Sequence, residues 1–343
     1  EIYPVLLMEG FGEDFMVRGR QFYAVWDEAH GIWSTDEYLV RKIVDDALKR
    51  EEAEFEKKYG SNFNKPITLK LFNESDSGSW QKYKSFISAC PDRFVSLDDN
   101  LMFADTPMTK ESYASKRLPY SIKKSDHNAY DEIMSVLYSP EEREKIEWAI
   151  GSILSGDSKK IQKFYVLYGK GGTGKGTVLQ IIRKLFKGYD ATFTAKDLCL
   201  DSKDFSMETF ASNPLVAIDG DGDLSRIEDA TKLNSIVSHE EILLNEKGKP
   251  HYPYTPHCTL FIGSNEPVKI KDEESGLIRR LIDINPTGEK IPASRYLMLM
   301  DQIDFELGGI AEHCLDVYKT RGRHFYDTYR PQSMLYRTNA FTN

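Results

Sequence analysis

The chain is poor in cysteine, in long apolar runs and in excess positive charge. Its four cysteines, Cys90, Cys199, Cys258 and Cys314, are widely spaced and match no metal-ligand spacing. We therefore expect buried, reduced thiols and a cytoplasmic setting. No apolar run approaches the roughly 20 residues of a membrane-spanning helix, which predicts no membrane partner. The net charge of −9 argues against a surface coated in positive charge, so any nucleic-acid contact requires a local basic feature.

What is present suits two domains and a full hydrophobic core, since 40% of the 343 residues are hydrophobic and 29% are charged. The chain begins at Glu1 rather than Met, which predicts a piece of a longer protein. We expect three segments: a mainly helical N-terminal region over 1–158, an α/β core over 159–290 and a C-terminal helical segment over 291–343.

Local signals define the first segment. Weak alternation and helix-capping patterns predict a strand over Gln21–Trp26, a helix that starts at the capping box Ser34–Glu37 and ends by Gly60–Pro66, a helix over Trp80–Ala89 and a helix from Ser139 to Gly156. From Lys163 onward, continuous apolar runs over 164–168, 215–218 and 259–263 predict buried parallel strands instead.

The most informative stretch is an apolar strand, a glycine-rich loop and an apolar helix face. Gly169, Gly174 and Lys175 match the phosphate-cradling pattern G-x-x-x-x-G-K in its strand–loop–helix context. Glycines let backbone N–H groups wrap a polyphosphate, the helix start directs its positive dipole end at the anion, and the lysine reaches the β- and γ-phosphates. This predicts a P-loop NTPase core that binds ATP at Gly169, Gly171, Gly172, Thr173, Gly174, Lys175, Gly176 and Thr177.

One position departs from the pattern. The residue after the lysine is usually Ser or Thr, which ligates Mg²⁺, and here it is Gly176. Thr177 follows and is our candidate on the phosphate and metal side, with Mg²⁺ held more by water and by a distant carboxylate. The wording Gly-Lys-Gly-Thr also occurs in nucleoside monophosphate kinases, so the loop alone does not fix the reaction.

Polar residues end two further apolar strands. Asp219 is our candidate Mg²⁺ residue, and Asp221 is the candidate for polarising the attacking water, because Gly220 occupies the spot often taken by Glu or Asp. Asn265 ends the next strand and can orient water against the γ-phosphate. A calcium loop fails because Leu224 stands where its invariant glycine belongs; a solvated acidic turn stays open.

Two basic features follow the acidic strand. Arg279 and Arg280 follow a loop and enter another apolar strand. In ring ATPases an arginine from the neighbouring subunit reaches the γ-phosphate, and this pair is our candidate for that role; the alternative is a surface salt-bridge pair. Between the acidic strand and Asn265, two short strands around a glycine turn carry Lys247, Lys249 and His251, with tyrosines nearby. Cations and aromatics together suit single-stranded DNA, while an ordinary exposed hairpin is the alternative.

In this order, the elements resemble superfamily 3 helicases of the phage, plasmid and poxvirus primase-helicase branch. The resemblance rests on Gly-Lys-Gly-Gly-Thr-Gly-Lys-Gly-Thr, the Lys-Gly-Lys-Pro hairpin, Ser264–Pro267, Gly276–Arg280 and the stretch from Glu306 to His313. It implies an AAA+-like fold, a homo-hexameric ring and Mg²⁺-dependent ATP hydrolysis. It also implies single-stranded or forked DNA drawn through the pore by Lys247 or Lys249 and His251. A primase or polymerase domain in the same polypeptide and, for a phage source, the host cytoplasm complete this expectation.

Two other functions stay open at this stage. A nucleotide kinase would explain the loop but not Asn265, the arginine pair or the lysine hairpin. A ring-shaped scaffold that loads a primase or polymerase on DNA, with weak or no ATPase, would suit Gly176 and Gly220.

Overall fold

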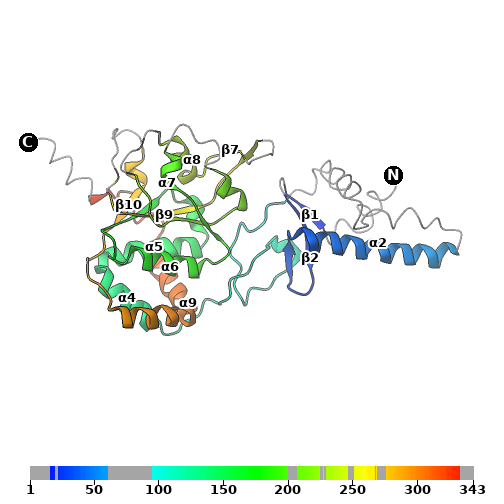
Figure 1. Cartoon of the computed structure of the whole chain (residues 1–343), viewed down its shortest axis with the longest axis horizontal. Coiled ribbons are helices and arrows are strands. Elements are labelled where there is room, and N and C mark those ends of the chain that lie inside the picture. The colour runs from blue at the N-terminus through cyan, green and yellow to red at the C-terminus, as the bar shows by residue number, and fades with distance from the viewer. Residues whose placement is uncertain are drawn as a thin grey trace, which may run out of the picture. The chain divides into compact units, whose positions relative to one another are not determined.

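The structure is a computed structural model of the chain (Figure 1). It describes residues 16–19, 22–60, 95–199, 207–224, 227, 229–245, 251–266, 268 and 276–332. The chain forms two compact units: unit 1 comprises residues 1–98 and 107–116, and unit 2 comprises residues 99–106 and 117–343. The helices that precede the glycine-rich loop along the chain, from residue 128 onward, therefore belong to the same unit as the loop.

Unit 1 contains a small antiparallel sheet and a long helix. Its elements are β1 (Met16–Arg18), β2 (Tyr23–Asp27), β3 (Ile32–Ser34), the long helix α2 (Glu37–Tyr59) and the 3₁₀ turn η4 (Lys110–Ser112). The predicted capping residue Ser34 is wrong: it still pairs in β3, and Asp36 accepts the Leu39 N–H at 2.8 Å instead. The helix ends before Gly60, as predicted. The helix predicted over Trp80–Ala89 lies outside the described residues.

Unit 2 is built on a five-stranded sheet in which every neighbouring pair is parallel. The strand order is β10-β4-β9-β6-β5. The strands are β4 (Phe164–Tyr168), β5 (Asp190–Thr192), β6 (Val216–Asp219), β9 (Thr259–Ser264) and β10 (Leu281–Ile284). The three apolar runs predicted as buried strands are confirmed to within one residue. Since the strands are parallel, their carboxyl ends meet at one edge of the sheet.

Helices cover both faces of this sheet (Figure 1). On one face Tyr165 and Leu167 pack with α4 (Asn128–Leu137), α5 (Pro140–Leu154), α6 (Lys175–Leu185) and α9 (Ala293–Arg321). On the other, Phe164 and Val166 pack with α7 (Ala195–Leu198) and α8 (Thr231–Val237). Alternate strand residues thus serve opposite layers, which is why the strands read as continuous apolar runs. The short 3₁₀ turns in the described part of unit 2 are η5 (Asp157–Lys160), η6 (Glu208–Ser212) and η8 (Ile278–Arg280).

The state of the cysteines and the lack of a membrane-spanning helix can be compared with expectation over the described residues. Cys199, Cys258 and Cys314 are free and buried, as predicted, and Cys90 lies outside the described residues. Among the helices that the structure describes, none combines the length and the apolar character that crossing a membrane requires.

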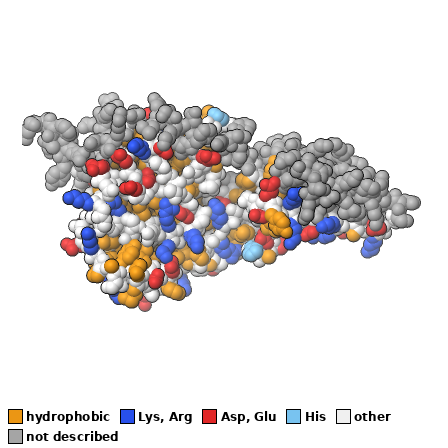
Figure 2. Space-filling model, in the orientation of Figure 1, with side chains coloured by type: hydrophobic (Ala, Val, Ile, Leu, Met, Phe, Trp, Pro, Cys, Tyr) orange, Lys and Arg blue, Asp and Glu red, His pale blue; other side chains and the backbone are white. Residues whose placement is uncertain are grey.

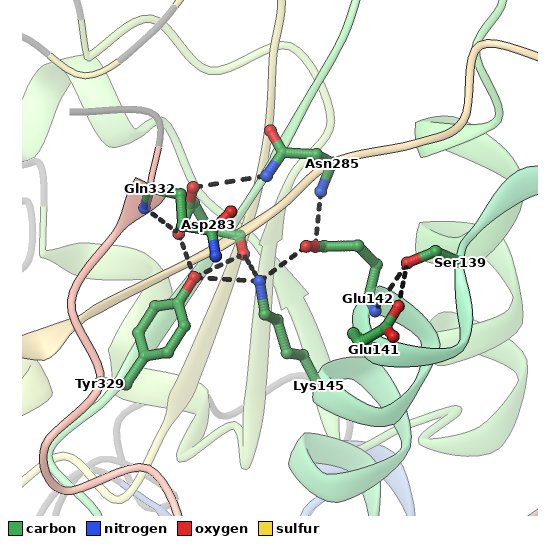
Figure 3. A network of polar contacts seen from close by, with 8 residues as sticks. All are labelled: Ser139, Glu141, Glu142, Lys145, Asp283, Asn285, Tyr329 and Gln332. Atoms are coloured by element: carbon green, nitrogen blue, oxygen red, sulfur yellow. Dashed lines mark hydrogen bonds and ion pairs between the residues drawn. The ribbon is translucent and has the colours of Figure 1, made fainter. Parts of the chain in front are cut away.

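A buried polar network joins α5, β10 and the segment after α9 (Figure 3). The Lys145 ammonium donates to Glu142 at 2.8 Å, to the Asp283 carbonyl at 2.8 Å and to the Tyr329 hydroxyl at 2.9 Å. Tyr329 in turn donates to the Asp283 carboxylate, and Glu142 accepts the backbone N–H of Asn285 at 2.8 Å. Because Asp283 and Lys145 are both buried, each charge depends on these partners. The network therefore ties the carboxyl end of β10 to α5 and to the segment after α9.

Helices α5 and α9 approach each other so closely that only glycine fits at one position. A Cβ at Gly151 would lie 2.1 Å from the backbone oxygen of Cys314. This backbone cannot swing aside as a flexible side chain would, because Cys314 lies fully buried in the interior of α9.

Gly151→Ala is expected to lower the free energy of unfolding by about 2 kcal/mol, since overpacking a close contact outweighs the helix propensity gained. Gly176→Ala is the matched control. It is also helical, nothing lies within 4 Å of its would-be Cβ, and it should stabilise by roughly 0.5 kcal/mol. Urea unfolding of both variants gives the comparison, and an equally stable Gly151→Ala protein would contradict the packing described.

Candidate functional site

The glycine-rich loop connects the carboxyl end of β4 to the start of α6. Gly169, Gly172 and Gly174 have φ angles of +152°, +81° and +91°, values that residues with a Cβ adopt only with strain. A Cβ at Gly174 would also lie 2.6 Å from the Leu137 side chain, which would have to shift to make room for it. The loop therefore follows a path that its glycines alone permit.

Lys175 is the first residue of α6 and its ammonium lies within the loop. It donates to the Gly169 carbonyl, to the Lys170 carbonyl at 3.1 Å and to the Asn265 side-chain oxygen at 2.9 Å. Burial lowers its pKa, and the Asp221 carboxylate opposes that shift. The charge is thus held by dipoles of the loop and by one distant carboxylate, an arrangement in which an anion would be a stronger partner.

Asn265 links the lysine to Asp221. Its amide donates to the Asp221 carboxylate at 3.2 Å while its oxygen accepts from Lys175. The sheet explains the meeting: β9 lies between β4 and β6, so the residue after β9 stands between the loop and the acidic turn. Three residues that sequence analysis singled out from separate motifs form one hydrogen-bonded chain.

Asp219 occupies a different position from Asp221. Its two carboxylate oxygens accept backbone N–H groups, from Ala195 at 2.7 Å and from Asp221 at 3.2 Å. Burial raises its pKa, and these hydrogen bonds act against the rise. Asp219 therefore holds the acidic turn and the start of α7 in place, whereas Asp221 faces the cleft described next.

A cleft of about 570 Å³ opens beside the loop. The loop, Gly220, Asp221 and Asn265 form one side of its lining, and Lys290 and Tyr296 contribute from the segment around the start of α9. Lys290 is a cation that sequence analysis missed: a Cβ on Gly172 would lie 3.7 Å from its ammonium nitrogen. Lys290 lies in the connection between β10 and α9 and belongs to no recognisable sequence motif, so its position near the loop follows only from the fold.

The second and third residues of α6 differ in their surroundings. Gly176 is exposed in the cleft and offers no hydroxyl, while Thr177 is buried. The residues present suit a polyphosphate through the loop and Lys175. For a divalent cation they offer the carboxylate of Asp221 and the Thr177 hydroxyl, with Asp219 already accepting two N–H groups.

Arg279 and Arg280 lie at the opposite end of the sheet. They end η8 immediately before β10, whose first residue, Leu281, pairs with Phe164, the first residue of β4. The loop follows the last residue of β4, so the arginines are separated from it by a strand of five residues, roughly 16 Å. The structure does not bring them to the loop of their own chain.

The predicted hairpin is present as β7 (Ile242–Leu244) and β8 (Tyr252–Tyr254), which pair antiparallel. His251 immediately precedes β8 and is exposed. Lys247 and Lys249, predicted at the tip, lie outside the described residues.

Comparison with known proteins gives a match to one family over the site. Residues 167–280 match DUF5906, a family of unknown function. That range contains the loop, both aspartates, Asn265 and the arginine pair.

A further match is the DNA primase-polymerase of Nitratiruptor phage NrS-1, which is 22% identical over 198 residues, 54% of this chain and 24% of that protein. The chain thus spans about a quarter of the relative's length. Two apo structures of the NrS-1 C-terminal region are similar in fold. One has a TM-score of 0.50 at 16% identity, covering 92% of this chain and 70% of that one. The other has a TM-score of 0.52 at 14% identity, covering 95% and 74%.

Unit 2 is thus a mixed α/β unit on a parallel five-stranded sheet, and the chain is similar in fold to the C-terminal region of the NrS-1 protein.

Proposed function

We propose that the protein is an ATP-dependent DNA helicase or translocase that acts in phage DNA replication. The observation that carries the proposal is the hydrogen-bonded chain from Lys175 through Asn265 to Asp221 beside a loop that requires glycine. It supports a P-loop NTPase site, in which a lysine neutralises phosphate, a carboxylate polarises water and an amide orients that water. Phosphate release with and without single-stranded DNA tests it.

ATP and Mg²⁺ are the proposed cofactors. The loop from Gly169 to Thr177 would hold the phosphates, and Lys290 supplies a second cation on the same side of the cleft. Asp219, Asp221 and Thr177 are the proposed residues on the metal side, with Asp221 in direct reach of the cleft. Bound Mg²⁺ would neutralise charge on the phosphate oxygens. The part of the chain itself is to orient and polarise the attacking water through Asn265 and Asp221.

A ring of copies is proposed because the arginine pair lies a strand's length from its own loop. An arginine there is out of reach of its own chain's loop and would serve the nucleotide of another copy, which suits a hexameric ring. Helix α9 exposes Leu297, Met298 and Phe305 at 68%, 53% and 83%, apolar surface suited to contact between copies. Figure 2 shows hydrophobic side chains gathered over the part of unit 2 where Figure 1 draws α4 and α9.

Single-stranded or forked DNA is the proposed partner, gripped by Lys247, Lys249 and His251 at the hairpin end. A primase-polymerase domain in the same polypeptide is proposed from the similarity to the NrS-1 protein, of which this chain spans about a quarter. The proposed setting is the cytoplasm of the host cell.

Replacing Lys247 and Lys249 with alanine should weaken single-stranded DNA binding and reduce the slope of log affinity against log salt by roughly 1.4, about 0.7 for each phosphate that is no longer neutralised. Basal ATP hydrolysis should persist. The double change Lys187→Ala and Lys319→Ala, at two exposed lysines outside the cleft lining, is the control and should alter neither quantity. Titration of labelled oligonucleotide at several salt concentrations measures both. Equal slopes for the two double variants would move the DNA contact elsewhere.

Asp221→Asn and Asp219→Asn should both reduce Mg²⁺-dependent turnover but differ in stability. Asp221 faces the cleft, so its loss should leave the unfolding free energy within about 0.5 kcal/mol of wild type. Asp219 accepts two buried N–H groups, and an amide offers only one oxygen, so Asp219→Asn should cost about 1–3 kcal/mol. Thermal unfolding beside steady-state turnover separates them, and equal stability losses would contradict the two roles.

A DNA-loading scaffold with weak ATPase is the second candidate. Gly176 favours it, because this exposed position, which usually holds a Ser or Thr whose hydroxyl ligates Mg²⁺, has no side chain here. Gly176→Ser separates the two functions. In a helicase, restoring the hydroxyl should leave turnover similar or raise it modestly, whereas in a scaffold no variant at this position should produce DNA-stimulated turnover.

A further inference from the structure

A second pocket, of about 320 Å³, lies at the amino end of the sheet, away from the glycine-rich loop. Five cationic side chains line it from four parts of the chain: Lys160, Lys163, Arg279, Arg280 and Arg323. They come from η5, the approach to β4, η8 and the segment after α9. A pocket with this lining concentrates positive charge in a chain whose net charge is −9.

Two carboxylates near this pocket contact other side chains, although the charge of Asp327 also acts on Lys163. Asp327, which shares the lining, lies 2.7 Å from the ring of His324. Asp157 lies 3.4 Å from Lys160 and accepts from the Tyr318 hydroxyl at 2.9 Å. Among the described residues, Lys163, Arg279, Arg280 and Arg323 form no ion pair.

Two of the unpaired cations are buried. Lys163 is 9% exposed, and its ammonium donates to the Arg279 carbonyl at 2.5 Å. Arg280 is 8% exposed and donates to the Gly276 carbonyl at 2.9 Å, while its buried Nε has no hydrogen-bond partner among the described residues. Arg280 thus carries a buried charge with no ionic partner among the described residues, and an anion in the pocket that its side chain lines would supply one.

Burial and neighbouring arginines lower the pKa of both buried cations, and a nearby carboxylate opposes each shift. Burial is the main cause that lowers the pKa of Lys163 to about 8. Asp327 opposes this shift, and Arg330, Arg279 and Arg280 contribute to it. Burial and Arg279 also lower the pKa of Arg280, opposed by Glu240. Like charges therefore press on one another here, and a bound anion would relieve that repulsion.

We propose that this pocket binds the terminal phosphate group of a nucleotide or polyphosphate, with Lys163, Arg280 and Arg323 as its principal ligands. Three unpaired cations favour a multiply charged terminal phosphate over the single charge of a phosphodiester. Two of them are buried, so the group must enter the pocket rather than pass across it, as a DNA backbone would. The affinity for phosphate stands without the proposed ATPase, whereas a neighbouring copy's nucleotide as the source rests on the proposed ring.

Pyrophosphate titrated calorimetrically into the Lys175→Ala chain isolates this pocket from the glycine-rich loop. Arg323→Gln, at a half-buried position, should weaken binding about tenfold, the effect of one charged hydrogen bond. Lys163→Met keeps the buried stem and should weaken it similarly. Lys187→Gln, an equal loss of charge outside the lining, should have no effect. Pyrophosphate binding that is absent, or the same in all these variants, would overturn the proposal, provided that circular dichroism shows each variant folded.

Sulfate, which does not titrate near neutrality, adds a readout that a folding defect would not imitate. Its affinity should fall between pH 7 and pH 9 as Lys163 loses its proton, because the charged form of a group with a pKa of about 8 prevails below that pH. Lys163→Met should remove this dependence. A sulfate affinity that is flat in the wild type would remove Lys163 from the site.

Sedimentation with ATP identifies the source of the phosphate. If a neighbouring copy supplies it, ATP should strengthen self-association of the otherwise wild-type chain, and Arg323→Gln should abolish that gain. If free nucleotide or phosphate is the ligand, self-association should ignore the variant while pyrophosphate binding still weakens. If an oligonucleotide displaced pyrophosphate from the wild-type pocket and did not do so in Arg323→Gln, the pocket would be assigned to DNA and the proposal overturned. Absent ATP hydrolysis with intact pyrophosphate binding would contradict only the ATPase.

Discussion

Replacing Lys175 with alanine is expected to reduce ATP hydrolysis by about 10²–10³ or more, with the fold intact. Among the described residues, the ammonium donates to two loop carbonyls and to Asn265, so the change removes contacts of the site and none of the hydrogen bonds that hold the core. What disappears is the positive charge in the cradle and the anchor of the Asn265–Asp221 pair. Steady-state phosphate release at saturating Mg²⁺ measures the effect.

Lys170→Ala is the matched control. Lys170 lies in the same loop and is exposed, and its contribution to the site is its backbone carbonyl, which alanine keeps. Its turnover should stay within a few-fold of wild type. Wild-type turnover by the Lys175→Ala protein would contradict the assignment of the loop.

Replacing both arginines with alanine should lower the rate of ATP hydrolysis by roughly 10³–10⁵-fold, the contribution of an arginine supplied in trans by a neighbouring subunit. Arg279 and Arg280 lie at the amino end of the sheet and the loop lies at its carboxyl end, so each chain's arginines serve another chain's nucleotide in this account. The single variants Arg279→Ala and Arg280→Ala identify the residue in contact. Arg280 is buried and bonded to Gly276, so its variant also needs a stability measurement.

Mixing inactive chains tests the trans arrangement. An arginine variant combined with Lys175→Ala should regain activity, because some interfaces then pair an intact loop with an intact arginine. The recovery should pass through a maximum near equal proportions. Absence of recovery at every ratio, with mixed assembly shown by sedimentation, would mean that the arginines act within their own chain or not at all.

The sequence was sufficient to predict the core of unit 2 because buried parallel strands leave a plain signal. Phe164–Tyr168 and the runs before Asp219 and Asn265 are apolar on both faces, and each was placed to within one residue. The meeting of Lys175, Asn265 and Asp221 depends on strand order, which spacing alone does not encode.

Other features required the three-dimensional structure. Asp219 and Asp221 look equivalent in sequence, yet one accepts backbone N–H groups and the other lines the cleft. Lys290 belongs to no pattern and reaches the loop only through the path from β10 to α9. The N-cap of α2 is Asp36, two residues after the predicted Ser34, because Ser34 still pairs within β3.

Phosphate release from ATP, with and without single-stranded DNA, tests the central claim most directly. We predict Mg²⁺-dependent release that rises on adding single-stranded DNA and is lost in Lys175→Ala. No DNA-stimulated release would contradict helicase function and favour the scaffold. Transfer of the phosphoryl group to a nucleoside monophosphate, in place of its release, would contradict the account and make the protein a kinase.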